Sequence, residues 1–198
     1  MLLLGLTGSV AMGKSTVAAF FAERGVAIFD ADRAVHDLYR GEAAPLVEDA
    51  FPGTVVDGVV DRVLLSGRVL RDRPAMTRLE TIIHPLVQKR EEAFCAATVA
   101  AGRRIALLDI PLLFEVGAES RVDAVIVVSA PAELQLQRLL ARPGMDKDRA
   151  MAMIARQVPD QDKRRRAHFI IDTGVSLAAT KQAVGDLLRA AAALAAGR

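Results

Sequence analysis

Residues 8–15 restrict the fold of this chain more than any other segment. They read GSVAMGKS and match the pattern G-x-x-x-x-G-K-[ST]. An apolar run precedes them and a helical pattern follows, which are the two contexts that such a loop requires. The loop is expected to wrap its backbone amides around the phosphates of ATP or GTP at a helix N-terminus. The alternative is a tight turn with a solvated lysine.

Two side chains of this loop have separate expected roles. Lys14 reaches the β- and γ-phosphates, and the Ser15 hydroxyl ligates a Mg²⁺ ion brought by the nucleotide. The chain contains no N-K-x-D element for reading guanine. A kinase of small molecules is therefore favoured over a GTPase.

Short apolar runs alternate with longer helical patterns along the chain. The runs, at 2–6, 26–29, 105–108, 124–128 and 169–171, are rich in Leu, Val and Ile and show no polar face. Such runs are typical of buried parallel strands. Helical patterns occupy residues 14–24, 32–39, 86–101, 131–141, 147–157 and 176–195. The alternation predicts a doubly wound α/β sheet that is covered on both faces.

Residues 41–102 break this alternation. They hold several prolines and glycines and a long helix but no clear buried strand, and they are too long for a simple crossover. We interpret them as a helical insertion over one end of the sheet, suited to a substrate domain. His84 and Pro85 are expected just before the long helix, where proline is favourable, with His84 a capping or buried residue.

Carboxylates follow two of the predicted strands. The carboxyl ends of parallel strands border the ligand crevice, so Asp30 and Asp32 are expected near the phosphates. Asp32 suits the base that accepts a proton from the attacking hydroxyl, or else it is the N-cap of the next helix. His36, one turn further on, is as well suited to a structural or substrate-contacting role as to that of a proton carrier. Asp109 ends the third strand and meets Mg²⁺ either directly or through water.

Two further segments have open interpretations. Residues 111–115, PLLFE, are either core packing or the wall of a large substrate site. Arg138, Arg142 and Arg149, with the basic run 163–166, either close over a transferred phosphoryl group or form surface salt bridges. The break at Pro143 and Gly144 predicts the hinge of a lid.

Composition excludes several classes of protein. Of the 198 residues, 52% are hydrophobic and 25% are charged, as in a soluble globular protein. A net charge of +2 is too balanced for a nucleic-acid coat, and no membrane span or signal peptide is evident. The single cysteine, Cys95, suits a reducing cytoplasm. The three histidines lack ligand spacing with Cys95, so Mg²⁺ is the expected metal.

In combination, these motifs closely resemble the dephospho-CoA kinase family. They are, in chain order, GLTGSVAMGKST from residue 5, DAD from Asp30 with a following histidine, HPLV from His84, DIPLLFE from Asp109, Gln135 with Arg138 and Arg142, and KRRRAHFIIDTG from Lys163. The resemblance implies a P-loop NTPase fold with a five-stranded parallel sheet, in one domain over residues 1–198. It places a helical CoA domain at 41–102 and a lid at 142–160. The implied reaction moves the γ-phosphoryl group of ATP to the ribose 3′-hydroxyl of dephospho-CoA, the last step of coenzyme A biosynthesis.

The resemblance also implies the site residues. Lys14, the base Asp32 and the lid residue Arg142 would be catalytic. The ATP site would comprise Gly8, Ser9, Ala11, Met12, Gly13, Lys14, Ser15, Thr16, Arg138, Arg142, Thr173 and Gly174. The acceptor would be bordered by Asp30, Asp32, His36, His84, Pro111, Leu112, Leu113 and Glu115. A monomer that binds ATP, Mg²⁺ and dephospho-CoA, and neither nucleic acid nor membrane, is expected.

The chain departs from the family's usual residues at four positions. Ala11 and Met12 replace glycine and serine, which the loop tolerates if their φ angles are negative. His168 replaces aspartate and Thr173 replaces asparagine, which affects the expected adenine contacts. The alternatives are another small-molecule P-loop kinase, such as a nucleoside or sugar-acid kinase, and a nucleotide-binding regulatory protein without catalysis.

Overall fold

A computed structural model of the chain describes residues 1–196 and divides into two compact units. Unit 1 comprises Met1–Phe29 and Thr98–Arg198, and unit 2 comprises Asp30–Ala97. Residues 197 and 198, the end of the predicted domain, lie outside the described residues. Within residues 1–196, no helix is both long enough and apolar enough to cross a membrane.

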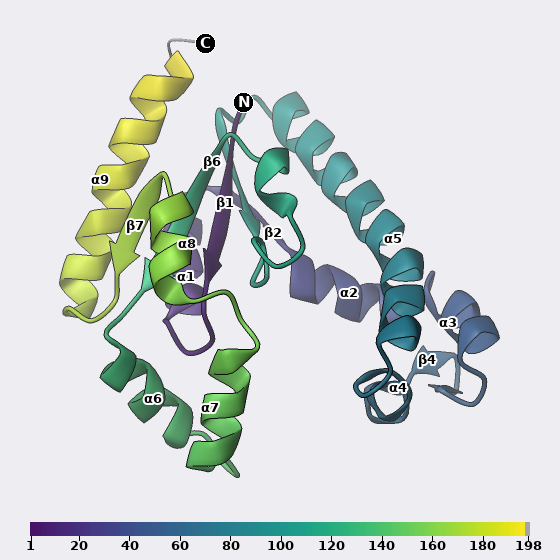
Figure 1. Cartoon of the computed structure of the whole chain (residues 1–198). Helices are drawn as coiled ribbons and strands as arrows, with labels where there is room; N and C mark the ends of the chain where they lie inside the picture. Colours follow the sequence, from purple (N-terminus) through teal and green to yellow (C-terminus); the bar gives the residue numbers. More distant parts are fainter. Residues whose placement is uncertain (197–198) are drawn as a thin grey trace. The chain divides into compact units, whose positions relative to one another are not determined.

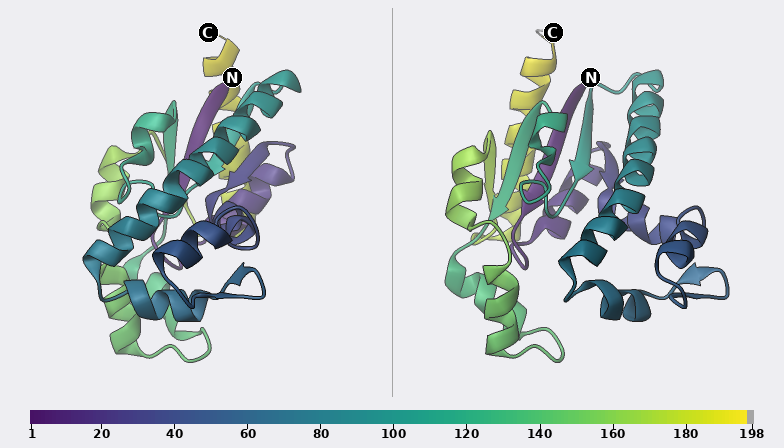
Figure 2. Two further views of the ribbon diagram at one scale, coloured as in Figure 1. Left: turned by 90° about the vertical axis from the view of Figure 1, so that its right-hand side faces the viewer. Right: turned by 45° about the vertical axis from the view of Figure 1, so that its right-hand side comes forward.

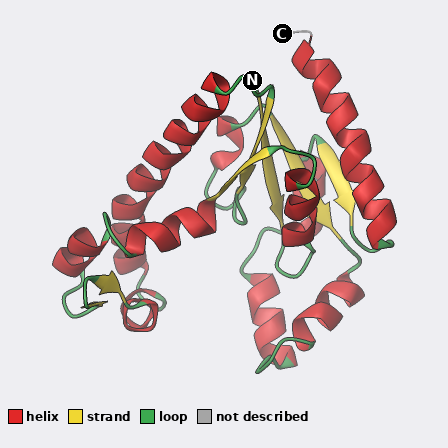
Figure 3. Cartoon of the chain, turned by 180° about the vertical axis from the view of Figure 1, so that it is seen from behind, coloured by secondary structure: helices red, strands yellow, loops and turns green. Residues whose placement is uncertain are grey.

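Unit 1 contains a five-stranded parallel sheet in the order β2-β5-β1-β6-β7, which confirms the predicted α/β fold (Figure 1). Figure 3 shows these strands side by side. The strands are β1 (Leu2–Gly8), β2 (Ala27–Asp30), β5 (Ile105–Asp109), β6 (Ala124–Ser129) and β7 (Phe169–Asp172). The helices are α1 (Lys14–Ala22), α6 (Ala132–Leu140), α7 (Lys147–Ala155), α8 (Asp160–Arg166) and α9 (Leu177–Ala196), with a 3₁₀ turn at Ala118–Arg121.

Both faces of the central strand β1 are buried, which is why most of its residues are apolar. Leu4 and Leu6 lie in one core with Phe21 of α1 and Val184 of α9. Gly5, on the opposite face, lies against the segment that follows β5: a Cβ at Gly5 would come within 2.7 Å of Leu113. Helix α8 packs against β6, so helices cover the sheet as predicted.

The topology gathers the strand ends that were predicted to carry function. β1 pairs in parallel with β5 and β6, with Leu6 opposite Asp109 and Gly8 opposite Val128. Parallel strands end at the same edge of a sheet, where ligands of such folds bind. Gly8 and Asp109 therefore lie at one edge.

Unit 2 is built from helices and one small hairpin. Its elements are α2 (Ala31–Tyr39), α3 (Ala44–Ala50), β3 (Val55–Val56), β4 (Val59–Val60), α4 (Arg62–Val69) and α5 (Arg73–Ala100), whose last turn extends past the unit. Leu38 of α2, Val47 of α3, Leu65 of α4 and Ile83 of α5 are buried in one core. Leu38 of α2 thus shares a core with the helices of the insertion predicted at 41–102.

The prediction that the long helix begins at residue 86, just after His84 and Pro85, is wrong. Helix α5 begins at Arg73 and continues through Pro85 as one helix (Figure 2). Asp72 caps it by accepting a hydrogen bond from the Ala75 amide (3.0 Å). An interior proline removes one helical hydrogen bond, but buried Ile83 and part-buried Leu86 pack on either side of it. This apolar packing holds the helix together across the proline.

Candidate active site

The phosphate-binding loop leaves β1 at Gly8 and enters α1 at Lys14. A Cβ at Gly8 would lie 2.7 Å from the Val128 carbonyl oxygen, so a larger residue would displace the neighbouring strand. Gly13 has a φ of 87°, and a Cβ there would lie 3.2 Å from Thr173 Oγ1. Gly8 is thus required because a side chain would not fit, and Gly13 because its backbone conformation disfavours other residues.

The loop keeps several backbone amides open toward a ligand. The Met12 amide donates to the Ser9 carbonyl (3.1 Å), which closes a turn, and the Thr16 amide donates to the Gly13 carbonyl (3.1 Å). Within residues 1–196, no protein acceptor receives the amides of Ala11, Gly13, Lys14 and Ser15. Open amides at a helix N-terminus are suited to phosphate oxygens.

An ion pair joins the loop lysine to the end of β5. Lys14 Nζ lies 2.5 Å from Asp109 Oδ1, and the two side chains are only 17% and 8% exposed. Asp109 thereby holds the ammonium group of Lys14, and phosphate oxygens bound by the loop would compete with Asp109 for it. The Ser15 hydroxyl and the Asp109 carboxylate are hard oxygen donors, which fit a Mg²⁺ ion that also keeps phosphate and water ligands.

Arg138 and Thr173 hold the phosphate-binding loop by hydrogen bonds to its backbone carbonyls. The Thr173 hydroxyl donates to the Met12 carbonyl (2.7 Å). Arg138 donates to that hydroxyl (3.1 Å), to the Thr173 carbonyl (2.8 Å) and to the Ala11 carbonyl (3.4 Å). Both residues, predicted for the ATP site, therefore bind loop atoms, and the neighbouring Gly174 is exposed.

The sequence matches a known protein family over most of its length. The family model for dephospho-CoA kinase matches residues 2–178. The chain belongs to the dephospho-CoA kinase family. The dephospho-CoA kinase of Mesorhizobium japonicum is 60% identical over 188 residues, or 95% of each chain. That of Agrobacterium fabrum is 53% identical over 190 residues, which cover 96% of this chain and 97% of the relative.

Solved structures share the fold. TT1252 from Thermus thermophilus has a TM-score of 0.84 at 31% identity and covers 95% of this chain and 96% of its own. Dephospho-CoA kinase from Campylobacter jejuni has a TM-score of 0.66 at 24% identity and covers 96% of each chain. A shikimate kinase from Acinetobacter baumannii, with a TM-score of 0.53 at 16% identity, shares the fold alone.

The two unusual loop residues of this family member behave differently. Ala11 has a φ of 62°, so the expectation of a negative angle is wrong for it. Met12 is 2% exposed, and its sulfur accepts a hydrogen bond from the Ala130 amide (3.1 Å). The bulk of Met12 therefore lies in the core of unit 1.

The Ala11→Gly variant is expected to be more stable than the parent chain. The left-handed conformation costs alanine roughly 1–2 kcal/mol in the folded state, and glycine avoids this cost. Glycine is also more flexible in the unfolded chain, which offsets about 0.4–1 kcal/mol of the gain. We expect the free energy of unfolding in urea to rise by about 0.5–1 kcal/mol. As a control, Ala190→Gly, at an exposed position within α9, should lower it by about 1 kcal/mol. A lower stability for Ala11→Gly would contradict the strain at residue 11.

His168, where the family commonly has aspartate, has a structural role. Its Nδ1 accepts a hydrogen bond from the Val125 amide (3.1 Å), and its own amide donates to the Val125 carbonyl (2.9 Å). These bonds extend the pairing of β6 with β7. An aspartate can accept the same backbone hydrogen bond, which explains how the two residue types replace each other.

A buried ion pair joins the PLLFE segment to α8, which the sequence did not reveal. Lys163 Nζ lies 2.9 Å from Glu115 Oε1, with the lysine side chain fully buried. The same oxygen accepts from the Val158 amide (3.0 Å). Desolvation raises the pKa of Glu115, but the bonds from Lys163 and Val158 outweigh it and leave the pKa below its ordinary value. Glu115 was predicted to border the acceptor, and in the structure its Oε1 contacts both Lys163 and the Val158 amide.

Breaking this pair should destabilise the protein strongly. Lys163→Met leaves the Glu115 carboxylate buried without its cation, which costs about 3–5 kcal/mol in the free energy of unfolding at pH 7. The double variant with Glu115→Gln should recover most of this loss. Because the pKa of Glu115 is lowered on folding, the pair stabilises above pH 4.5, and this contribution is lost as pH falls through the folded pKa.

The control for this prediction is a lysine in an exposed pair. Lys181 lies 2.6 Å from Glu23 with half of its side chain exposed, so Lys181→Met should cost less than about 1 kcal/mol. A similar loss of stability in both lysine variants would contradict the account of the buried pair.

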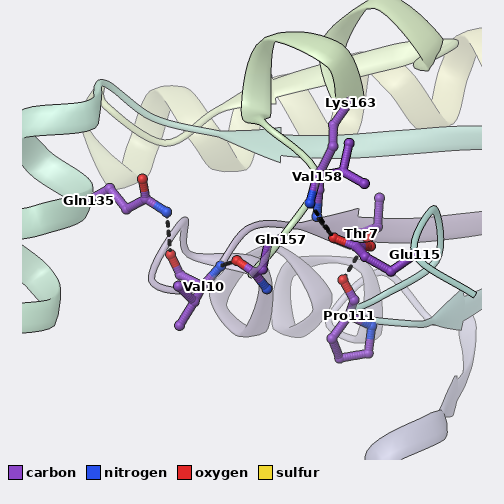
Figure 4. A network of polar contacts seen from close by, with 8 residues as sticks. All are labelled: Thr7, Val10, Pro111, Glu115, Gln135, Gln157, Val158 and Lys163. Atoms are coloured by element: carbon purple, nitrogen blue, oxygen red, sulfur yellow. Dashed lines mark hydrogen bonds and ion pairs between the residues drawn. The ribbon is translucent and has the colours of Figure 1, made fainter. Parts of the chain in front are cut away.

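The other PLLFE residues, 111–114, divide between core packing and exposure to a substrate. Leu113 is fully buried and Phe114 nearly so, hence both serve the core. The Arg166 guanidinium stacks on the Phe114 ring at 4.2 Å. Pro111 accepts the Thr7 hydroxyl (2.9 Å) through its carbonyl (Figure 4). Leu112 is 43% exposed and Pro111 is partly exposed, so both are available to a substrate.

The predicted acceptor residues of unit 2 are exposed. Asp30 caps α2 by accepting from the Arg33 amide (2.9 Å), so the cap alternative for Asp32 is wrong. Asp32 is exposed in the first turn of α2, and His36 is exposed in the last turn of the same helix. His84 lies exposed within α5, so its expected capping or buried position is wrong.

The predicted lid begins at a sharp turn. Arg142 follows α6 and is exposed, and no residue in the described part of the chain pairs with its guanidinium group. Gly144 has a φ of 72° and is followed by α7, which Asp146 caps. Arg142 is thus free to meet a phosphate, as a lid arginine must.

Proposed function

We propose that this protein transfers the γ-phosphoryl group of ATP to the ribose 3′-hydroxyl of dephospho-CoA and releases coenzyme A and ADP. The observation that carries the proposal is the loop of open amides around Lys14, in a chain that belongs to the dephospho-CoA kinase family. Relatives named dephospho-CoA kinase cover 95% or more of the chain at 50–60% identity, which disfavours a nucleoside or sugar-acid kinase.

The loop binds and orients the donor nucleotide. The open amides of Ala11, Gly13, Lys14 and Ser15 donate hydrogen bonds to the phosphate oxygens. Lys14 leaves Asp109 to neutralise the charge on the β- and γ-phosphates. The Ser15 hydroxyl and the Asp109 carboxylate would hold a Mg²⁺ ion brought with the nucleotide, which would supply further positive charge. Arg142 approaches the transferred group from the lid and stabilises its equatorial oxygens.

Asp32 is the proposed base for the acceptor hydroxyl. A bond forms between the ribose O3′ and the γ-phosphorus, and the bond to the bridging β–γ oxygen breaks with its electron pair leaving on ADP. The proton of the 3′-hydroxyl passes to the Asp32 carboxylate. Asp32 does not cap α2, because Asp30 is the N-cap of that helix. The Asp32 carboxylate is exposed and therefore available to accept the proton.

A coupled ADP-release assay with a panel of acceptors tests the proposed function. The protein is incubated with ATP, Mg²⁺ and either dephospho-CoA, a nucleoside or shikimate. We expect turnover with dephospho-CoA only. Turnover with nucleosides and none with dephospho-CoA would refute the proposal.

We place the protein in the cytoplasm as a monomer. The single thiol, Cys95, can form no internal disulfide, which suits a reducing compartment. Sedimentation with and without both substrates would test the monomeric state.

A further inference from the structure

Two glutamines hold the peptide groups on either side of Val10 in the phosphate-binding loop (Figure 4). Gln135 Nε2 donates to the Val10 carbonyl (2.9 Å), and Gln157 Oε1 accepts from the Val10 amide (2.8 Å). The partners fix which end of each side-chain amide faces the loop, because a carbonyl only accepts and an N–H only donates.

The bond from Gln135 orients the peptide group that contains the Ala11 amide. A trans peptide is planar, so its C=O and N–H point in opposite directions. With the Val10 carbonyl turned toward Gln135, the Ala11 amide points away from it and stays open to a ligand. Ala11 has a φ of 62°, a conformation that alanine disfavours. The bond from Gln135 therefore helps to hold this strained peptide group in place.

The bond to Gln157 orients the preceding peptide group. The Val10 amide points toward Gln157, so the Ser9 carbonyl of the same group points the opposite way. That carbonyl accepts the Met12 amide (3.1 Å) and closes the turn that leads to Gly13. The two glutamines thus set successive peptide planes ahead of the open amides.

Both glutamines are themselves held in place. Gln135 is 4% exposed, within α6. Gln157 precedes Val158, whose amide is bound by Glu115, and Glu115 is paired with the buried Lys163. In Figure 4 the Lys163 side chain descends from α8 to this junction. Gln135 therefore approaches the loop from α6, which precedes the predicted lid, and Gln157 from the end of the predicted lid, where Glu115 holds the neighbouring Val158 amide.

We propose that Gln135 and Gln157 are positioning residues for phosphoryl transfer, which preset the loop amides for the phosphates of ATP. The inference rests on the proposed function for its donor, ATP, but requires no particular acceptor. Loss of either bond should therefore weaken nucleotide binding even when no acceptor is present.

Replacing glutamine by glutamate tests the proposal, because it has opposite consequences at the two positions. Gln157→Glu keeps an acceptor for the Val10 amide, so the Kd for ATP should stay within about threefold of the parent value. Gln135→Glu removes the donor and sets a carboxylate against a carbonyl, which should raise the Kd at least roughly tenfold. The Kd is measured by titrating a fluorescent ATP analogue with Mg²⁺ and no acceptor.

Exposed glutamines on α6 and α8 control for the added charge. Gln137→Glu and Gln161→Glu should leave the Kd unchanged. If Gln135→Glu fails to fold, Gln135→Met and Gln157→Met each remove one bond without charge, and both should raise the Kd several-fold. Parent-like binding by the Gln135 variants, or equal loss in the two glutamate variants, would overturn the proposal.

The acceptor assay separates this proposal from the proposed function. A parent protein that binds ATP, shows the asymmetry between Gln135 and Gln157, and fails to phosphorylate dephospho-CoA would contradict the function alone. Turnover of dephospho-CoA without the asymmetry would contradict the positioning role alone.

Discussion

Asp32→Asn is expected to lower kcat by roughly 10²- to 10⁴-fold, as removal of a general base does. Asparagine has nearly the same shape but cannot accept the proton of the 3′-hydroxyl. ATP binding should change little, because the phosphate contacts come from the loop of unit 1. Steady-state kinetics with dephospho-CoA and a nucleotide titration give the two quantities.

Two aspartates of the same helix region serve as controls. Asp37→Asn, also exposed on α2, should keep normal turnover. Asp30→Asn keeps a side chain that can cap α2, so its free energy of unfolding should stay near the parent value. Asp30→Ala removes the cap and should lower the free energy of unfolding by about 1 kcal/mol. Near-normal turnover by Asp32→Asn would exclude it as the base.

Lys14→Ala should fail in both binding and rate. The ammonium group contacts the phosphates in the ground state and meets the charge that develops during transfer. We expect the Kd for ATP to rise about tenfold and kcat to fall roughly 10²- to 10³-fold, as for loss of one preorganised donor. Pre-steady-state phosphoryl transfer and nucleotide titration measure the two effects.

Removing Lys14 also leaves Asp109, only 8% exposed, without this cation, so folding must be checked by thermal unfolding. Lys14→Met retains much of the side-chain stem and should show the same kinetic loss. Lys181→Ala, on the exposed surface of α9, is the matched control and should behave like the parent. Full activity in either Lys14 variant would mean that the loop does not bind ATP as proposed.

The sheet could be predicted from the sequence because its central strands β1, β5 and β6 are buried on both faces and all five strands are apolar runs. Each of the five apolar runs became a strand of the parallel sheet, with β1 two residues longer than predicted. Thr7 and Gly8 extend it by pairing with Val127 and Val128. A threonine and a glycine carry little apolar signal, so the pattern ended at Leu6.

The errors arose where a residue's environment depends on distant parts of the chain. Lys163 stands in a run of four basic residues, three of them exposed, and its burial depends on Glu115 of another segment. The positive φ of Ala11 cannot be read from an alanine, since hydrogen bonds from elsewhere hold its peptide groups. Pro85 lies within a helix because of packing in unit 2, which local proline preferences do not include.

The structure of the product tests the proposed function most directly. The protein is incubated with ATP, Mg²⁺ and dephospho-CoA, and the product is analysed by mass spectrometry and ³¹P NMR. We expect one new phosphate monoester on the ribose 3′-oxygen, in amounts equal to the ADP formed. A phosphate at another position, or ADP formed without any phosphorylated acceptor, would contradict the proposed reaction.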